Sequence, residues 1–107
     1  MKWFWDLWGG VRAWFEPRYK AQDVEDIPDT LRDHTLYLVG EGCPWQAAMR
    51  CPCGCGAVIQ LSLLPNDHPR WRATLDRRAR PTLTPSVWRT TGCRAHFFLR
   101  DGRILWC

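Results

Sequence analysis

The sequence predicts a small, mainly β domain that is stabilised by a metal ion, ends in a β-hairpin and follows an aromatic N-terminal helical segment. Three observations support this prediction: short β-rich apolar stretches from residue 35 onward, an Asp-Gly turn near the C-terminus, and a cluster of cysteines. With 107 residues the chain has the length of one domain. A domain this small buries only a modest core, so a bound metal would contribute strongly to its stability.

Residues 1–20 are predicted to form an aromatic amphipathic segment of their own. Spacings of three and four residues place apolar side chains along one helical stripe, made by Phe4, Leu7, Trp8, Val11 and Phe15. Gly9 and Gly10 weaken an isolated helix by about 1 kcal/mol each, and Pro17 ends it. The stripe suits docking on its own domain, and a membrane surface or a partner's groove are the alternatives.

Residues 21–34 are acidic and polar, a composition typical of a linker with at most a short helical turn. The folded domain is therefore expected to start near Thr35 and to cover residues 35–107. Within it, β-type sequence predicts strands over 35–39, 45–49, 57–64, 71–75 and 82–88. The stretch 57–64 is the strongest of these candidates, and Gly40-Glu41-Gly42 is expected to turn the chain after the first.

The last predicted element is a hairpin formed by residues 96–99 and 103–106. Asp101-Gly102 lies between them, and this dipeptide is a strong signal for a two-residue turn. Such a turn pairs Arg100 with Arg103, and counting outward places His96 opposite Cys107. Cys93 lies just beyond, so we expect it to approach Cys107.

The cysteines predict a metal site. Cys51, Cys53 and Cys55 alternate with Pro and Gly in a turn too tight for easy disulfides, and Cys93 and Cys107 follow late in the chain. Four of these five thiols would close a tetrahedral zinc site with no position for water, so the Zn²⁺ would be structural. A disulfide scaffold or reduced, buried cysteines are the alternatives.

Cys43 is then the spare thiol. The sequence shows no signal-peptide pattern, and six cysteines without a leader favour a reducing compartment. We therefore expect a cytoplasmic protein. No apolar run reaches the length that spans a bilayer, so no transmembrane segment is predicted.

The net charge and the number of aromatic residues indicate which kinds of partner the chain could bind. The net charge is +4, and Arg77, Arg78 and Arg80 form a dense basic run. We interpret this run as a solvated loop and do not expect it to bind nucleic acid. An acidic protein partner is an alternative, because the planar guanidinium groups of arginine suit carboxylate recognition. Eight tryptophans exceed what so small a core can hide, so some should lie at a binding surface.

One candidate pair could carry nucleophilic chemistry. Ser86 follows Pro85 in a stiff stretch, and His96 lies three residues after Cys93, where a metal would fix the backbone. A nucleophilic serine needs a nearby oriented base, which His96 would supply. The alternatives are Ser86 as a turn residue, and His96 as a fourth zinc ligand or a core histidine.

Several motifs occur in a characteristic order along residues 35–107. They are Cys51-Pro-Cys-Gly-Cys-Gly, Leu63-Leu-Pro, Pro69-Arg-Trp71, Leu83-Thr-Pro-Ser86-Val-Trp88, Gly92-Cys-Arg-Ala-His96-Phe-Phe and Gly102-Arg-Ile-Leu-Trp-Cys107. Together they resemble a small zinc-binding domain family encoded in bacterial ubiquitination-like (Bub) operons, beside E1-like, E2-like and ubiquitin-like proteins. The resemblance does not extend to the aromatic N-terminal segment.

The resemblance implies a zinc-stabilised serine peptidase that processes or removes ubiquitin-like modifiers. Carried over by position, Ser86 becomes the nucleophile and His96 the general base, while the cysteines hold zinc. Ala95 stands where the family often has serine, which argues against a nucleophile beside His96. Candidates for a third catalytic member are Glu41, Asp67 and His68. The expected partners are a ubiquitin-like protein, its conjugates, and the E1-like and E2-like proteins of the operon.

Two other functions are considered. A non-catalytic zinc-ribbon-like module would bind protein or nucleic acid through the tryptophans and residues 77–80. A metallohydrolase would use Glu41 to assist a zinc-bound water, and it requires an open coordination position. For the peptidase, the exposed tryptophans that would hold a substrate tail are expected among Trp45, Trp71 and Trp88.

Overall fold

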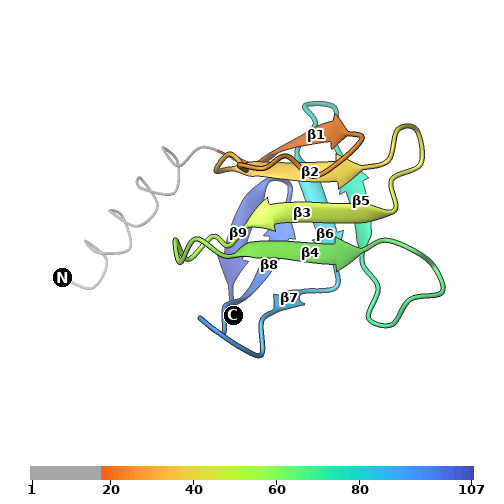
Figure 1. Ribbon diagram of the computed structural model, residues 1–107. Helices are drawn as coiled ribbons and strands as arrows, with labels where there is room; N and C mark the ends of the chain where they lie inside the picture. The colour runs from red at the N-terminus through yellow and green to blue at the C-terminus, as the bar shows by residue number, and fades with distance from the viewer. Residues whose placement is uncertain (1–17) are drawn as a thin grey trace.

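The computed structural model describes residues 18–107, so the predicted helical segment over 1–20 lies almost wholly outside the described residues. Within this range the chain forms strands in three sheets (Figure 1). None of the described residues belongs to a helix with the length and hydrophobicity needed to cross a membrane. The strands are β1 (Lys20–Val24), β2 (Thr35–Val39), β3 (Gln46–Arg50), β4 (Val58–Ser62), β5 (Arg72–Leu75), β6 (Pro81–Thr84), β7 (Val87–Trp88), β8 (His96–Arg100) and β9 (Arg103–Trp106).

The largest sheet has the order β1-β2-β3-β4. β2, β3 and β4 form an antiparallel meander, in the places where the sequence predicts the first three strands. Gly40 and Gly42 both have positive φ in the connection after β2, where the turn is predicted. The β3–β4 connection carries the cysteine-rich turn at one end of this sheet.

The prediction of an acidic linker over residues 21–34 is wrong for its first part. Lys20–Val24 is strand β1, which pairs in parallel with β2 in the register Lys20↔Thr35. Parallel pairing is held by backbone hydrogen bonds to a strand that is distant in sequence, so polar residues suffice at this sheet edge. Ordered structure therefore begins before Thr35, and the buried Tyr19 already belongs to the core.

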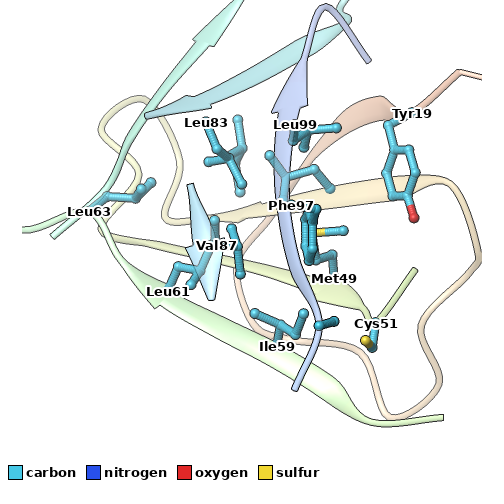
Figure 2. Packing of buried hydrophobic residues seen from close by; sticks show 14 residues of the cluster. Tyr19, Met49, Cys51, Ile59, Leu61, Leu63, Leu83, Val87, Phe97 and Leu99 are labelled. Carbon is cyan, nitrogen blue, oxygen red and sulfur yellow. The ribbon is translucent and has the colours of Figure 1, made fainter. Parts of the chain in front are cut away.

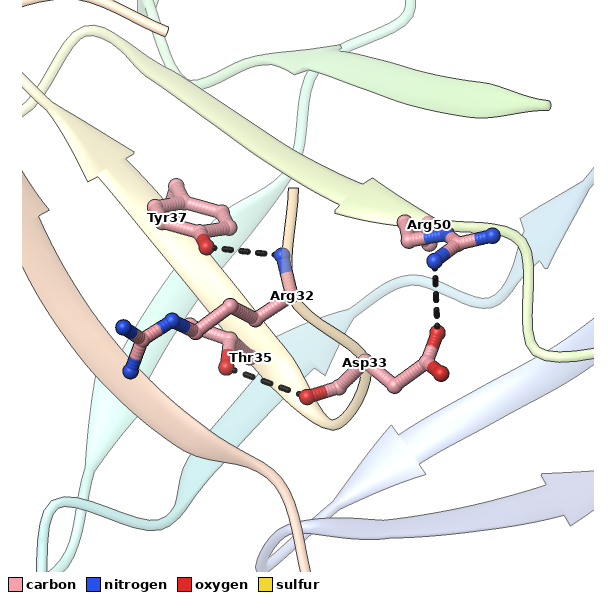
Figure 3. Close-up of polar contacts among 5 residues, drawn as sticks. All are labelled: Arg32, Asp33, Thr35, Tyr37 and Arg50. Atoms are coloured by element: carbon pink, nitrogen blue, oxygen red, sulfur yellow. Dashed lines mark hydrogen bonds and ion pairs between the residues drawn. The ribbon is translucent and has the colours of Figure 1, made fainter. Parts of the chain in front are cut away.

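The remainder of the predicted linker packs against the large sheet. Leu31 is buried with Tyr37 and Ala48 on the face opposite the main core. The Arg32 backbone N–H donates to the Tyr37 hydroxyl at 2.9 Å, and Asp33 pairs with Arg50 at 3.4 Å (Figure 3). This connection therefore covers the second face of β2, which explains why most of that strand is buried.

Residues 82–88, predicted as one strand, are split into two. β6 pairs with β5, whereas β7 pairs with β8 in a three-stranded sheet of order β7-β8-β9. The break falls at Pro85 and Ser86, because proline has no N–H to donate to a ladder of hydrogen bonds. Ser86 thus lies between two strands, at a point where the chain passes from one sheet to another.

The C-terminal hairpin has the predicted register. Arg100 pairs with Arg103, Phe97 pairs with Trp106, and the Cys107 N–H donates to the His96 carbonyl at 3.0 Å. Asp101 and Gly102 both have positive φ, as a type I′ turn requires. The prediction that His96 lies opposite Cys107 is therefore confirmed.

The main core lies between the large sheet and the sheet containing β8. Phe97 and Leu99 of β8 are fully buried, and Figure 2 shows them with Met49 of β3 and Val87 of β7. Alternation along β8 then places His96 and Phe98 on the opposite, outward side. Cys51 is buried at the edge of the same cluster, so the cysteine-rich turn adjoins the core.

Candidate active site and thiol cluster

The side chains of Ser86 and His96 meet at the start of the three-stranded sheet. Ser86 Oγ lies 3.0 Å from His96 Nε2, and both residues are half-buried. This is the distance at which an imidazole accepts the proton of a serine hydroxyl. In that role Nε2 is the unprotonated nitrogen of the neutral ring, and the ring proton is on Nδ1.

Backbone contacts fix the main chain on both sides of this pair. The Trp71 indole N–H donates to the Ser86 carbonyl at 3.2 Å, while the His96 carbonyl accepts from the Cys107 N–H. Trp88 pairs directly with His96 across β7 and β8, and the two rings stack with centroids 5.1 Å apart. The imidazole is thus held between a hydroxyl and an indole face.

Four thiols gather near the start of β8, the strand that begins with His96. The Sγ atoms of Cys51, Cys53, Cys55 and Cys93 all lie within 4.8 Å of one another. Cys51 Sγ is 3.3 Å from Cys53 Sγ and 3.5 Å from Cys93 Sγ. Because Zn–S bonds of about 2.3 Å in a tetrahedron separate the sulfurs by roughly 3.8 Å, this group has the size of a tetrahedral zinc–thiolate site.

The group brings together two distant parts of the chain. Cys51, Cys53 and Cys55 come from the β3–β4 connection, whereas Cys93 comes from the β7–β8 connection. Cys107 is exposed at the end of β9 and does not belong to the group. Of the five predicted ligands, the structure therefore assembles these four, and Cys93 approaches the early cysteines without Cys107.

Local hydrogen bonds favour the thiolate form at two of these sulfurs. The Ala95 N–H lowers the pKa of Cys93 to about 6, and the Ala57 N–H lowers the pKa of Cys55. Hydrogen bonding with the neighbouring Cys51 thiol raises the pKa of Cys53 to about 12. Thiols this close cannot all ionise without a cation, whereas a metal ion would hold all four as thiolates.

Arg89 links the thiol cluster to the backbone just before His96. Its guanidinium Nη1 donates to Cys93 Sγ at 3.2 Å and to Cys55 Sγ at 3.5 Å. The Arg89 backbone N–H also donates to the Ala95 carbonyl, one residue before His96. Sequence reasoning missed both Arg89 and the stacking of Trp88, since their contacts depend on the register between β7 and β8.

The other candidates make no hydrogen bond with the His96 ring. Glu41 and His68 are exposed in loops, and Asp67 accepts a hydrogen bond from the Ser62 hydroxyl. Among residues 18–107, no side chain other than that of Ser86 hydrogen-bonds to the His96 ring, so none of these three contacts the imidazole in this way. The cluster in the described chain that could hold a metal ion contains cysteines alone, and Glu41 is not part of it.

Comparison with known proteins identifies the family. A family model matches residues 23–107, and it describes a serine protease of a bacterial ubiquitination-like system, BubE. The chain belongs to the BubE family. The resemblance to a family of Bub operons is thereby confirmed, and BubE-type sequence extends further toward the N-terminus than residue 35, into β1. No significant match was found among curated proteins or solved structures.

Proposed function

We propose that Ser86 and His96 form the catalytic pair of this BubE-family protein, which cleaves after the C-terminal tail of a ubiquitin-like modifier. The observation that carries the proposal is the 3.0 Å contact between Ser86 Oγ and His96 Nε2. Family membership supports serine protease chemistry, and the chain has only one other serine, Ser62. Ser62 hydrogen-bonds to Asp67 and has no such base beside it.

The geometry suits acyl transfer. Ser86 Oγ attacks the carbonyl carbon of the scissile bond while its proton passes to His96 Nε2. The resulting imidazolium donates that proton to the leaving nitrogen, the carbon–nitrogen bond breaks, and an acyl-serine ester remains. A water molecule then gives a proton to His96 and attacks the ester carbonyl. The bond to Ser86 Oγ breaks as His96 returns that proton to the serine oxygen, and the modifier leaves with a free carboxylate.

No carboxylate orients the imidazole in the described chain, so other contacts must do so. Stacking on Trp88 restricts the ring plane, and the hydrogen bond from Cys107 to the His96 carbonyl fixes its backbone. Trp88 is 64% exposed, so its free edge is available to an extended substrate tail beside the pair. Trp45 is also exposed, as predicted. Trp71 is instead half-buried, packs against the core and donates its indole N–H to the Ser86 carbonyl.

The role proposed for zinc is structural. Cys51, Cys53, Cys55 and Cys93 would hold Zn²⁺, and four thiolates leave no coordination position for a reacting water. Zinc held there would fix Cys93, and with it the short stretch of backbone that leads to His96. Cysteines that form no disulfides suit a reducing cytoplasm. The proposed partners are the ubiquitin-like protein and the E1-like and E2-like proteins of the same system.

A cleavage assay with both serines tests this proposal. The substrate is a ubiquitin-like protein carrying a C-terminal reporter extension, and the variants are Ser86→Ala and the matched control Ser62→Ala. Because nucleophile removal leaves only residual catalysis, Ser86→Ala should lower kcat/KM by at least about a thousandfold. Ser62→Ala should cleave at close to the wild-type rate.

Equal cleavage by wild type and Ser86→Ala would contradict the assignment. Absence of cleavage in all three proteins, together with tight substrate binding, would favour a non-catalytic binding module.

A further inference from the structure

The outward face of the β7-β8-β9 sheet is apolar beside the serine–histidine pair. Phe97 and Leu99 point into the core, so alternation along β8 exposes His96 and Phe98. Leu105 pairs with Phe98 on the same face, and Trp88 pairs with His96. We call Trp88, His96, Phe98 and Leu105 the outer strip.

The side chains of the outer strip are unusually exposed for apolar groups on paired strands. Trp88 is 64% exposed, Phe98 36% and Leu105 41%. Single exposed apolar residues are common on proteins, but a contiguous row that begins at a reactive pair is typical of a binding surface. The strip continues directly from the stacked His96 ring, so a molecule bound there also reaches Ser86.

Positive charge lies at the far end of the outer strip. Arg100 and Arg103 face each other across the hairpin, and the Arg100 guanidinium lies 5.5 Å from the Phe98 ring centroid. Directly opposed like charges destabilise a pair of strands. Among the described residues neither arginine takes part in an ion pair, so an acidic group on a partner would relieve this repulsion.

We propose that the outer strip binds the protein substrate outside its scissile bond, taking an apolar side chain over Phe98 and Leu105 and a carboxylate at Arg100 and Arg103. The inference rests on the proposed function, since it treats the strip as an extension of the Ser86 site. It assigns the substrate a specific chemistry: an apolar residue followed by an acidic group, lying along β8.

Binding and catalysis are measured separately to test this inference. Affinity for a ubiquitin-like protein is measured by fluorescence anisotropy in the Ser86→Ala background, which prevents cleavage. Phe98→Thr and Leu105→Thr keep a strand-forming residue while removing apolar area. Each should weaken affinity roughly tenfold, the usual effect of losing an anchor residue at an interface. Arg103→Glu should weaken it further and reduce its dependence on salt.

Leu75→Thr is the matched control. Leu75 is 48% exposed on β5, in a different sheet, and its replacement should leave affinity unchanged. In proteins that retain Ser86, the rate of labelling by a serine-reactive fluorophosphonate measures the reactivity of Ser86. This small probe does not need to bind the outer strip. The labelling rate should be the same in wild type, Phe98→Thr and Leu105→Thr.

The outcomes separate the two proposals. Wild-type affinity in Phe98→Thr and Leu105→Thr would overturn the role of the strip while leaving the serine assignment intact. Labelling that persists in Ser86→Ala would overturn the serine assignment, even if the strip variants bind weakly. The strip variants are also tested for binding to a single-stranded oligonucleotide. If Phe98→Thr and Leu105→Thr lose affinity for the oligonucleotide but keep it for the ubiquitin-like protein, the outer strip would be a nucleic-acid-binding surface and the inference would fail.

Discussion

At the scale of single residues, the candidate site depends on a few polar contacts made by side chains from neighbouring loops and strands. Ser86 lies in the break between β6 and β7, and His96 begins β8. Arg89 donates through its side chain to two thiols and through its backbone to Ala95, the residue before His96. Four thiolates around Zn²⁺ would carry a net charge of about −2, which a guanidinium partly neutralises.

Replacing Arg89 tests this second layer of contacts around the cluster. Arg89→Ala removes the N–H···S hydrogen bonds and the positive charge, so zinc should be released to a colorimetric chelator roughly 10–100-fold more readily. Arg89→Lys is the matched control, because it keeps the charge but lacks the planar fork, and it should fall between wild type and Arg89→Ala. Identical zinc release in all three proteins would contradict the role given to Arg89.

At the scale of elements, the C-terminal hairpin carries His96 and also contacts the N-terminal edge of the fold. The Gly102 carbonyl accepts a hydrogen bond from the Tyr19 N–H, and the Gly102 N–H donates to the Pro81 carbonyl. The turn thus joins β1, β6 and the β8–β9 pair. Gly102 is buried, although most turn glycines of proteins lie at the surface.

Two glycines with nearly equal backbone conformation allow this contact to be measured. Gly102 has φ +78° and Gly42 has φ +76°, so alanine at either position incurs a similar strain of roughly 1–2 kcal/mol. A Cβ at Gly102 would also lie 2.8 Å from the Tyr19 carbonyl oxygen, whereas a Cβ at Gly42 has nothing within 4 Å. Gly102→Ala should therefore lower the free energy of unfolding by about 1–3 kcal/mol more than Gly42→Ala.

Urea unfolding of both variants in the presence of zinc provides the comparison. If Gly102→Ala and Gly42→Ala lower the free energy of unfolding equally, the backbone near Tyr19 must move aside for the new Cβ at no energetic cost. That result would contradict the tight contact between Gly102 and Tyr19.

Elements specified by local sequence were the most predictable. The Asp101-Gly102 turn fixes the hairpin register by itself, so the opposition of His96 and Cys107 followed from counting. β1 was not predictable in this way, because Lys20–Val24 is mostly polar and each of its residues pairs with a residue of β2 that lies fifteen positions further along the chain. Pro85 lies at the point where 82–88 divides into β6 and β7. Proline alone does not show that a strand breaks there, and the break is established by the different partners of the two strands, β5 for β6 and β8 for β7.

The same distinction applies to the site. The spacing of Cys51, Cys53 and Cys55 indicated a metal turn, and the stiff stretch after Pro85 directed attention to Ser86. Which late cysteine joins the cluster depends on the path of the β7–β8 connection, and sequence spacing does not determine that path. The stacking of Trp88 on His96 likewise follows from a strand register that no short motif encodes.

At the scale of the whole molecule, the thiol cluster connects the two sheets that enclose the core. Three of its cysteines follow β3 in the large sheet, and the fourth precedes β8 in the sheet that faces it. A metal bound there would close the end of the core at Cys51, which is itself buried in the hydrophobic cluster. For a domain of this size, metal binding would contribute a large part of the folding free energy.

Zinc content and thermal stability of cysteine variants test this architecture. Cys93→Ser should bind far less than one zinc per chain and should melt at a markedly lower temperature, because it removes the ligand that links the sheets. Cys107→Ser and Cys43→Ser are matched controls with exposed thiols outside the cluster, and both should keep full zinc content. Zinc loss in Cys107→Ser with none in Cys93→Ser would contradict the ligand set.

The most direct measurement of the central claim is the position of a fluorophosphonate adduct, mapped by peptide mass spectrometry of the zinc-loaded protein. If Ser86 is the nucleophile activated by His96, the adduct should form on Ser86, and His96→Gln should slow its formation by orders of magnitude. An adduct on Ser62, or labelling of Ser86 at the same rate in His96→Gln, would contradict it.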